Sequence, residues 1–157
     1  MGCFIMDLNF NNELDNIFSI IGESKIMSLA TSSKNRPTVR LISCIVYNRK
    51  ILFQTGNDLL KFEQMCDNNN VGLCFNNIQM EGVVKIIGKT NDEQNNKIME
   101  IFKKYFQKSY ETYSHYDKEM LIEISLTKIV KWDYENEKPF RIFFDINNNT
   151  IKKEMYL

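Results

Sequence analysis

The sequence predicts an α+β protein, built mainly of antiparallel strands that close into a small barrel with flanking helices. Stretches rich in β-branched residues alternate apolar and polar positions and are separated by short turns, with only a few helical patterns between them. The chain has 157 residues, of which 43% are hydrophobic, and this suits one domain with a sizeable core. We therefore expect residues 1–157 to form a single domain.

The first half of the chain predicts one helix followed by three strands. Residues 9–23 place apolar side chains at helical spacing and end near a glycine, which is typical of an amphipathic helix. Residues 25–31 and 38–48 have the composition of strands joined by a turn at 32–37, and residues 50–56 form the returning strand. The short connections predict antiparallel neighbours.

The second half predicts further helices and strands. Asn57 or Asp58 is the expected N-cap of a short helix that carries Lys61 in its first turn. The later elements are strands at 71–76 and 80–91, an amphipathic helix at 92–110, a long strand at 120–134, and a final strand with a polar tail at 139–157.

The charge balance excludes some classes of ligand. Lys plus Arg and Asp plus Glu each number 20, so the formal net charge is zero. Proteins that bind nucleic acid electrostatically carry a basic excess, and none is present, so we expect no nucleic-acid partner. The first 18 residues lack the pattern of a signal peptide, and no apolar run is long enough to span a bilayer. We expect a cytoplasmic protein without a membrane partner.

Cysteine and histidine are too scattered for a dedicated metal site. Cys3, Cys44, Cys66 and Cys74 form no Cys-x-x-Cys pair, and His115 is the only histidine. Disulfides are disfavoured in the expected compartment. Cys44 and Cys74 lie in apolar runs, so we expect both to be small buried hydrophobic residues.

Two cations stand where an anion would explain them. Because side chains alternate along a strand, Arg40 shares one face with Thr38, in the middle of an apolar run. An arginine there must be solvated or matched to an anion, and Lys61 lies at a helix start that also favours anions. Together with the Thr55 hydroxyl they could surround one phosphate. Taken singly, each cation is better explained in the ordinary way: Arg40 by an edge strand with an acidic residue nearby, and Lys61 by a solvent-exposed helix face.

A series of short motifs occurs in a fixed order along the chain: LATS, RPTVR, ILFQTG, a helix bearing a lysine, VGLCF and VVKIIGK. In order and spacing, the stretch from Ser24 to Thr90 resembles the flavin-binding split-barrel family of pyridoxamine 5′-phosphate oxidase-like proteins. The similarity extends more loosely to the strand that ends at Trp132. In that family an antiparallel barrel dimerises, and flavin mononucleotide (FMN) lies where the two subunits meet.

The resemblance implies a homodimer with FMN as cofactor. The FMN-binding positions that it implies are Arg40 and Lys61 at the phosphate, Thr55 beside the ribityl-phosphate, and Leu41, Ile42 and Ser43 along the isoalloxazine, partly through backbone groups.

Departures from the family pattern narrow the expected branch. Leu60 stands where members often carry a basic or hydroxyl residue before the helix lysine. The vitamin-converting oxidases have a C-terminal Arg-x-His motif, whereas here Arg141 is followed by Ile142 and Phe143. True pyridoxamine phosphate oxidation is therefore not expected, and the shorter chain resembles the general-stress or nitroimidazole-reductase branch.

The resemblance favours an oxidoreductase in which FMN takes electrons from NADH or NADPH and passes them to a small organic acceptor. An alternative is a flavin- or haem-binding module without turnover, in which haem would need an axial ligand such as His115. A third is a structural dimer whose Arg40 and Lys61 pair with carboxylates. We expect His115 to be a surface residue and Trp132 to pack at the barrel end.

Overall fold

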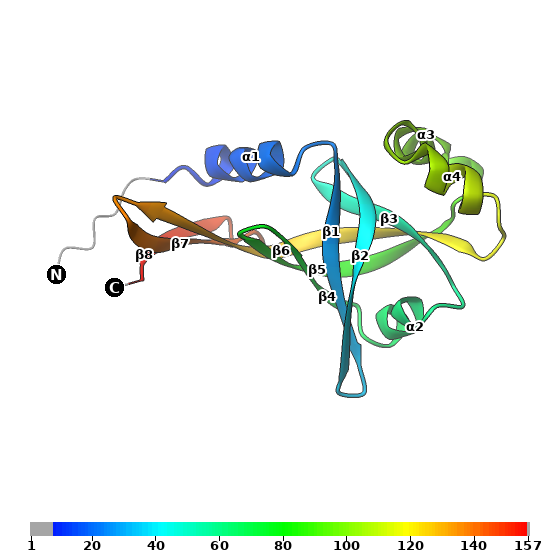
Figure 1. Cartoon of the computed structure of the whole chain (residues 1–157), viewed down its shortest axis with the longest axis horizontal. Coiled ribbons are helices and arrows are strands. Elements are labelled where there is room, and N and C mark those ends of the chain that lie inside the picture. The colour runs from blue at the N-terminus through cyan, green and yellow to red at the C-terminus, as the bar shows by residue number, and fades with distance from the viewer. Residues whose placement is uncertain (1–7, 157) are drawn as a thin grey trace.

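The structure, a computed structural model, describes residues 8–156. Six of its strands close an antiparallel barrel in the order β3-β2-β1-β4-β5-β6, with β3 pairing back to β6, and two more strands extend the sheet beyond β6 (Figure 1). Four α-helices accompany the barrel within these residues. The prediction of an α+β, mainly antiparallel split barrel with flanking helices is confirmed.

The barrel strands follow the predicted order with small changes of boundary. Their bounds are β1 Ser24–Ser33, β2 Arg36–Tyr47, β3 Lys50–Gly56, β4 Asn70–Phe75, β5 Ile78–Lys89 and β6 Glu119–Glu135. Two-residue turns join β1 to β2 and β2 to β3. All four turn residues have positive φ, as the twist of a tight hairpin requires: Lys34, Asn35, Asn48 and Arg49.

β2 separates from β3 partway along its length. It pairs with β1 from Arg36 to Ile45, but with β3 only from Ile45 to Tyr47. β3 goes on to pair with β6 over its whole length. The backbone edge of residues 38–44 therefore has no β3 partner, and the β1–β2 hairpin projects from the barrel (Figure 1).

The barrel core follows from alternation along the strands. On β2, Ile42 and Cys44 are buried, whereas Val39 and Leu41 are each 69% exposed. α1 (Phe10–Ile21) adds its apolar face to the same core through Leu14, Ile17 and Ile21. The side chain of Asn9 accepts a hydrogen bond from the Asn12 backbone N–H at 3.1 Å, and Gly22 ends the helix with φ 77°.

β6 extends past the barrel as part of a three-stranded ribbon with β7 (Lys138–Asp145) and β8 (Thr150–Met155) (Figure 1). The expectation of a polar tail after the final strand is wrong, because residues 150–155 pair with β7. Trp132 does not close the barrel end, because β5 pairs with β6 only as far as Lys131. Trp132 lies on the ribbon and is 36% exposed.

Two predictions about helices need correction. α2 (Leu60–Asp67) has Leu59 at its N-cap position without a side-chain cap, because the Asp58 carboxylate binds the Lys118 ammonium at 2.9 Å instead. The helix expected at 92–110 is three pieces, with bounds η1 Glu93–Asn95, α3 Asn96–Tyr105 and α4 Gln107–Tyr113. The break falls at Phe106, whose ring lies 5.3 Å from that of Phe102 in a second apolar cluster.

The two cysteines expected in the core have different environments. Cys44 is buried, and burial raises the pKa of its thiol to about 12. Cys74 is exposed, so that prediction is wrong: its register partner on β1 is Ser28, whose own partner on β2 is the exposed Leu41. All three residues lie on the outer face of the sheet. Cys3 lies outside the described residues.

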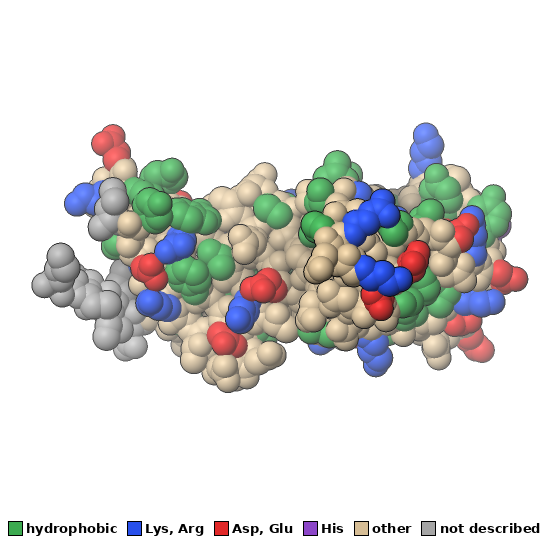
Figure 2. All heavy atoms as spheres, turned by 90° about the horizontal axis from the view of Figure 1, so that it is seen from below, with side chains coloured by type: hydrophobic (Ala, Val, Ile, Leu, Met, Phe, Trp, Pro, Cys, Tyr) green, Lys and Arg blue, Asp and Glu red, His purple; other side chains and the backbone are tan. Residues whose placement is uncertain are grey.

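The face of the molecule seen in Figure 2 carries charges of both signs. Basic and acidic side chains are interspersed on the face seen in Figure 2, and hydrophobic side chains gather at its left end over the β6–β7–β8 ribbon. The exposed apolar residues of the ribbon are Trp132, Tyr134, Met155 and Tyr156. Among residues 8–156, no helix is long and apolar enough to cross a membrane.

Candidate cofactor site

Arg40 is half-buried on the face of β2 that turns toward α2. Its guanidinium donates hydrogen bonds to the Leu29 carbonyl oxygen at 3.2 Å, to the Thr31 hydroxyl oxygen at 2.7 Å and to the Thr38 hydroxyl oxygen. Three of the five guanidinium N–H groups are thereby used. No carboxylate of residues 8–156 forms an ion pair with Arg40.

Lys61 lies in the first turn of α2 and is also half-buried. Burial lowers the pKa of its ammonium group, the nearby charge of Arg40 lowers it further, and Glu119 acts in the opposite direction. Among the described residues Lys61 has no ion-pair partner either. The fold therefore brings two cations into electrostatic range of one another.

This arrangement is unfavourable for the protein alone. Partly desolvated like charges repel each other, and burial lowers the pKa of Arg40 as well. An anion between the two groups would reverse both effects, and the two unused N–H groups of Arg40 suit two oxygens of one phosphate. The alternative in which Arg40 and Lys61 pair with carboxylates finds no support in the described part of the chain.

Thr55 supplies a second sign of an incomplete site. Its side chain on β3 is 3% exposed, and its hydroxyl has no hydrogen-bond partner among residues 8–156. Buried hydroxyl groups nearly always have a partner, because leaving one unpaired costs about 1–3 kcal/mol. Thr55 precedes Gly56, which lies opposite Glu119 in the β3–β6 register. The carboxylate of Glu119 is the group that counteracts the lowering of the pKa of Lys61 by burial. The orphaned hydroxyl therefore belongs to the same region as the cations.

The three residues expected along the isoalloxazine differ in what they can offer. The side chain of Ile42 is 6% exposed and belongs to the core, so only its backbone can meet a ligand. Leu41 points to the opposite face and is exposed, and Ser43 is half-buried. All three lie on the β2 edge that has no β3 partner. A strand edge of this kind offers free backbone N–H and C=O groups to a polar ring edge.

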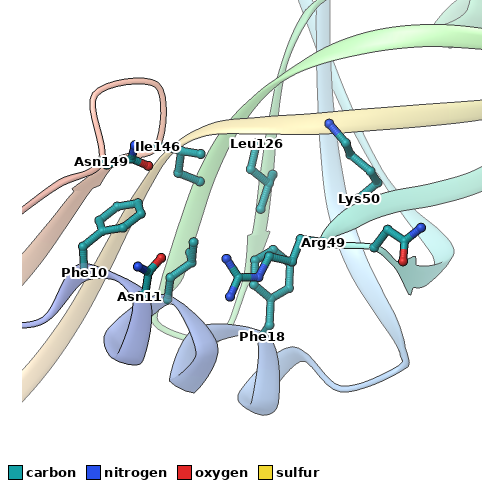
Figure 3. Close-up of a pocket in the computed structure, with 10 residues that line it drawn as sticks. Phe10, Asn11, Phe18, Arg49, Lys50, Leu126, Ile146 and Asn149 are labelled. Carbon is teal, nitrogen blue, oxygen red and sulfur yellow. The ribbon is translucent and has the colours of Figure 1, made fainter.

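The cavities near the helices are separate from this region. A cavity of about 270 Å³ lies between α1, the β2–β3 turn and the β7–β8 turn, with Phe10, Phe18 and Leu126 at its apolar walls (Figure 3). A second cavity of about 430 Å³ contains His115, which is exposed as expected. Neither cavity is lined by a predicted FMN-binding residue.

Sequence reasoning missed several residues around the cations. Gln64 and Thr31 hydrogen-bond to one another at 2.6 Å and are 2% exposed, and Glu119 is 6% exposed. The position of Gln64, three residues after Lys61 on a helix, was a usable signal that the two share a face. Thr31 and Glu119 could be found only once the strand register was known. No group of three or more metal-binding side chains occurs in the described part of the chain.

The chain belongs to the pyridoxamine 5′-phosphate oxidase family, whose sequence profile matches residues 14–133. That range contains β1 to β5, β6 except for its last two residues, α2 and the cation pair. No curated protein matches the chain.

Solved structures share the fold at low sequence identity. PhzG from Burkholderia lata 383, in complex with tetrahydrophenazine-1-carboxylic acid, has a TM-score of 0.65 and 12% identity over 92% of this chain and 90% of that one. General Stress Protein 26 from Bacillus anthracis str. Sterne has a TM-score of 0.63 and 16% identity, over 88% and 100%. A pyridoxamine 5′-phosphate oxidase-related, FMN binding protein from Nostoc punctiforme PCC 73102 has a TM-score of 0.59 and 12% identity over 100% of this chain and 98% of that one.

Proposed function

We propose that this protein is an FMN-dependent oxidoreductase of the cytoplasm. It takes electrons from NADH or NADPH and passes them to a small organic acceptor. The observation that supports FMN most directly is the pair of half-buried cations, Arg40 and Lys61, neither of which forms an ion pair with a carboxylate of residues 8–156. One FMN-binding neighbour in the same fold family supports the same cofactor.

The residues present fit the cofactor. Arg40 and Lys61 hold its phosphate, and the orphaned Thr55 hydroxyl donates to the ribityl-phosphate end. The β2 edge at Leu41, Ile42 and Ser43 meets the isoalloxazine through backbone groups. When bound, FMN supplies two-electron redox chemistry that no side chain can provide. The protein's part is to bind, to orient and to exclude water.

Oxidation of pyridoxamine phosphate is not the proposed reaction. Arg141, the nearest candidate in this chain for the arginine of the substrate motif in the vitamin-converting oxidases, binds the Glu154 carboxylate at 2.9 Å. Its guanidinium also lies 5.1 Å from the ring of Trp132. A guanidinium already paired with a carboxylate is poorly available to a substrate phosphate.

A homodimer completes the proposal. The outer face of β1 and β2 carries Ile26, Val39 and Leu41, which are 57%, 69% and 69% exposed. Small residues Ser28 and Ala30 lie opposite Leu41 and Val39 in the register, so the apolar side chains stand clear of their neighbours. A second copy of the chain would cover this apolar face beside the open β2 edge, and would shield the flavin from water.

Binding of FMN and of riboflavin, which lacks the phosphate, tests the proposal. We expect Arg40→Ala to weaken FMN binding about 10- to 100-fold, since a charge-assisted contact is lost, and to change riboflavin binding little. Flavin fluorescence titration measures both affinities. Equal FMN affinity in the two proteins would contradict the assignment of Arg40.

The redox role has its own measurement. We expect NADH or NADPH to bleach the flavin absorbance of the loaded protein, and a nitroaromatic acceptor to restore it. Absence of bleaching with either donor would overturn the oxidoreductase proposal while leaving FMN binding intact. A Soret band on adding haem, without any affinity for flavin, would instead favour the haem-binding alternative.

A further inference from the structure

A buried hydrogen-bond network links α2 to the β1–β2 hairpin behind Arg40. The Gln64 side-chain oxygen lies 2.6 Å from both the Thr31 and the Thr38 hydroxyl oxygens. The Gln64 side-chain nitrogen donates to the Arg36 carbonyl oxygen at 2.8 Å. The same two threonine hydroxyls receive the N–H groups of Arg40.

The groups at the two ends determine the direction of the hydrogen bonds that run from Arg40 through the threonines to Gln64. A guanidinium can only donate, so both threonine hydroxyls must accept from Arg40 and turn their own hydrogens toward Gln64. The Gln64 oxygen accepts both, while its nitrogen is occupied by a carbonyl, which fixes the orientation of the amide. Bonds arranged head to tail in this way polarise and strengthen one another.

Gln64 also stands on the element that carries the second cation. Lys61 and Gln64 are three residues apart in α2 and therefore share a face of the helix. Gln64 is 2% exposed, and both polar atoms of its side chain already bond to protein groups. It thus connects the helix of Lys61 to the threonines that hold the guanidinium of Arg40.

We propose that Gln64 is a positioning residue that orients Arg40 and sets its separation from Lys61, and so determines the preference of the site for a phosphate-bearing flavin. This inference rests on the proposed function. Without the Gln64 oxygen the threonine hydroxyls are free to rotate, and the two unused N–H groups of Arg40 lose their fixed direction. The consequence is a loss of phosphate recognition rather than a general loss of flavin affinity.

The measured quantity is the ratio of the dissociation constants for riboflavin and FMN. We expect Gln64→Met to lower this ratio about tenfold. Riboflavin affinity should remain near that of the wild type at temperatures well below the unfolding transition. A purely structural role would change the affinities for both ligands together and would leave the ratio unchanged.

Gln54→Met is the matched control. Gln54 is a half-buried glutamine that holds α4 through Ser109 and accepts a hydrogen bond from the Ser114 hydroxyl, without contact to Arg40. Its loss should lower the melting temperature and leave the ratio unchanged. If Gln64→Met fails to fold, the double variant Thr31→Val, Thr38→Val removes the same network with isosteric strand residues, and it should lower the ratio equally.

The Arg40→Ala background separates the two proposals. If Gln64 acts through Arg40, its substitution should have no further effect on the ratio there. Two outcomes would overturn the inference: additive losses of the ratio in the Arg40→Ala, Gln64→Met double variant, or an unchanged ratio in both Gln64→Met and the threonine variant. In either case the effect of Arg40→Ala alone would still support the FMN phosphate site. A wild-type ratio near one would instead overturn the proposed phosphate site, and this inference with it.

Discussion

At the scale of single residues, the site combines two cations with one buried carboxylate that does not pair with either. Glu119 is 6% exposed, and burial raises the pKa of its carboxyl above the ordinary value of 4.5, while Lys118 and Lys61 act in the opposite direction. The net rise means that desolvation outweighs the attraction of the nearby ammonium groups. Ionised Glu119 therefore destabilises the fold of the ligand-free protein.

We expect Glu119→Gln to stabilise the ligand-free protein at pH 7. Because the folded carboxyl keeps its proton to higher pH than the unfolded one, the unfolded chain binds fewer protons between the two pKa values. The free energy of unfolding then falls as pH rises from 4.5 through the folded pKa. The variant should melt about 1–4 °C higher at pH 7, and the difference should vanish below pH 4.5.

The melting temperatures of the wild type and of Glu119→Gln, measured by thermal unfolding from below pH 4.5 to pH 7, test this prediction. Glu100→Gln, at an exposed position on α3, is the control for the removal of one surface carboxylate. A difference that persists unchanged below the ordinary pKa would show that Glu119→Gln acts through packing and not through the charge.

At the scale of elements, the alternation of side chains along the strands explains which strand thiols are shielded from alkylation. Cys44 points into the barrel with a pKa of about 12, whereas Cys74 points outward and Cys66 is exposed on α2. Since the thiolate is the reactive form, iodoacetamide at pH 8 should modify Cys66 and Cys74 in the native protein. Cys44 should be modified only after unfolding in guanidinium chloride.

Peptide mass spectrometry of the alkylated protein distinguishes the three positions. The native and unfolded samples serve as controls for one another. Rapid modification of Cys44 under native conditions would mean that β2 opens readily at the point where β3 leaves it.

The sequence predicted most elements because their signals are local. Alternation of apolar and polar residues identified the strands, and turn residues such as Asn35 and Asn48 marked the hairpins within a residue or two. Both asparagines have positive φ in the structure. The break at Phe106 and strand β8 escaped because neither has a glycine or proline signal, and both depend on tertiary contacts. The cap of α2 was misplaced because Asp58 binds Lys118, sixty residues away in the sequence.

The candidate site divides in the same way. Arg40, Thr55 and Lys61 could be proposed from one-dimensional patterns together with the family resemblance. The spacing could place Gln64 on the same helix face as Lys61, but its hydrogen bond to Thr31 depends on a contact between α2 and the hairpin that the sequence does not reveal. The predicted role of Ile42 had to be limited to its backbone, because the core takes its side chain.

At the scale of the whole molecule, the barrel is closed, but part of its outer surface is apolar and exposed. The apolar face of β1 and β2, with Ile26, Val39 and Leu41, lies beside the free backbone edge of residues 38–44. An exposed apolar sheet face next to an unpaired edge is a feature that soluble proteins normally cover. A second copy of the chain is the proposed cover.

Val39→Asp tests this arrangement. In a symmetric dimer each substitution occurs twice at the interface, so two carboxylates are buried or brought together and dimerisation should weaken at least about 100-fold. Sedimentation velocity at micromolar concentration should then show a monomer, whereas Ile20→Asp, on the exposed side of α1, should leave the dimer intact. If flavin lies at the interface, Val39→Asp also weakens FMN and riboflavin binding alike, unlike Arg40→Ala, which affects FMN alone. A wild-type protein that sediments as a monomer with full FMN affinity would show that one barrel suffices for the site.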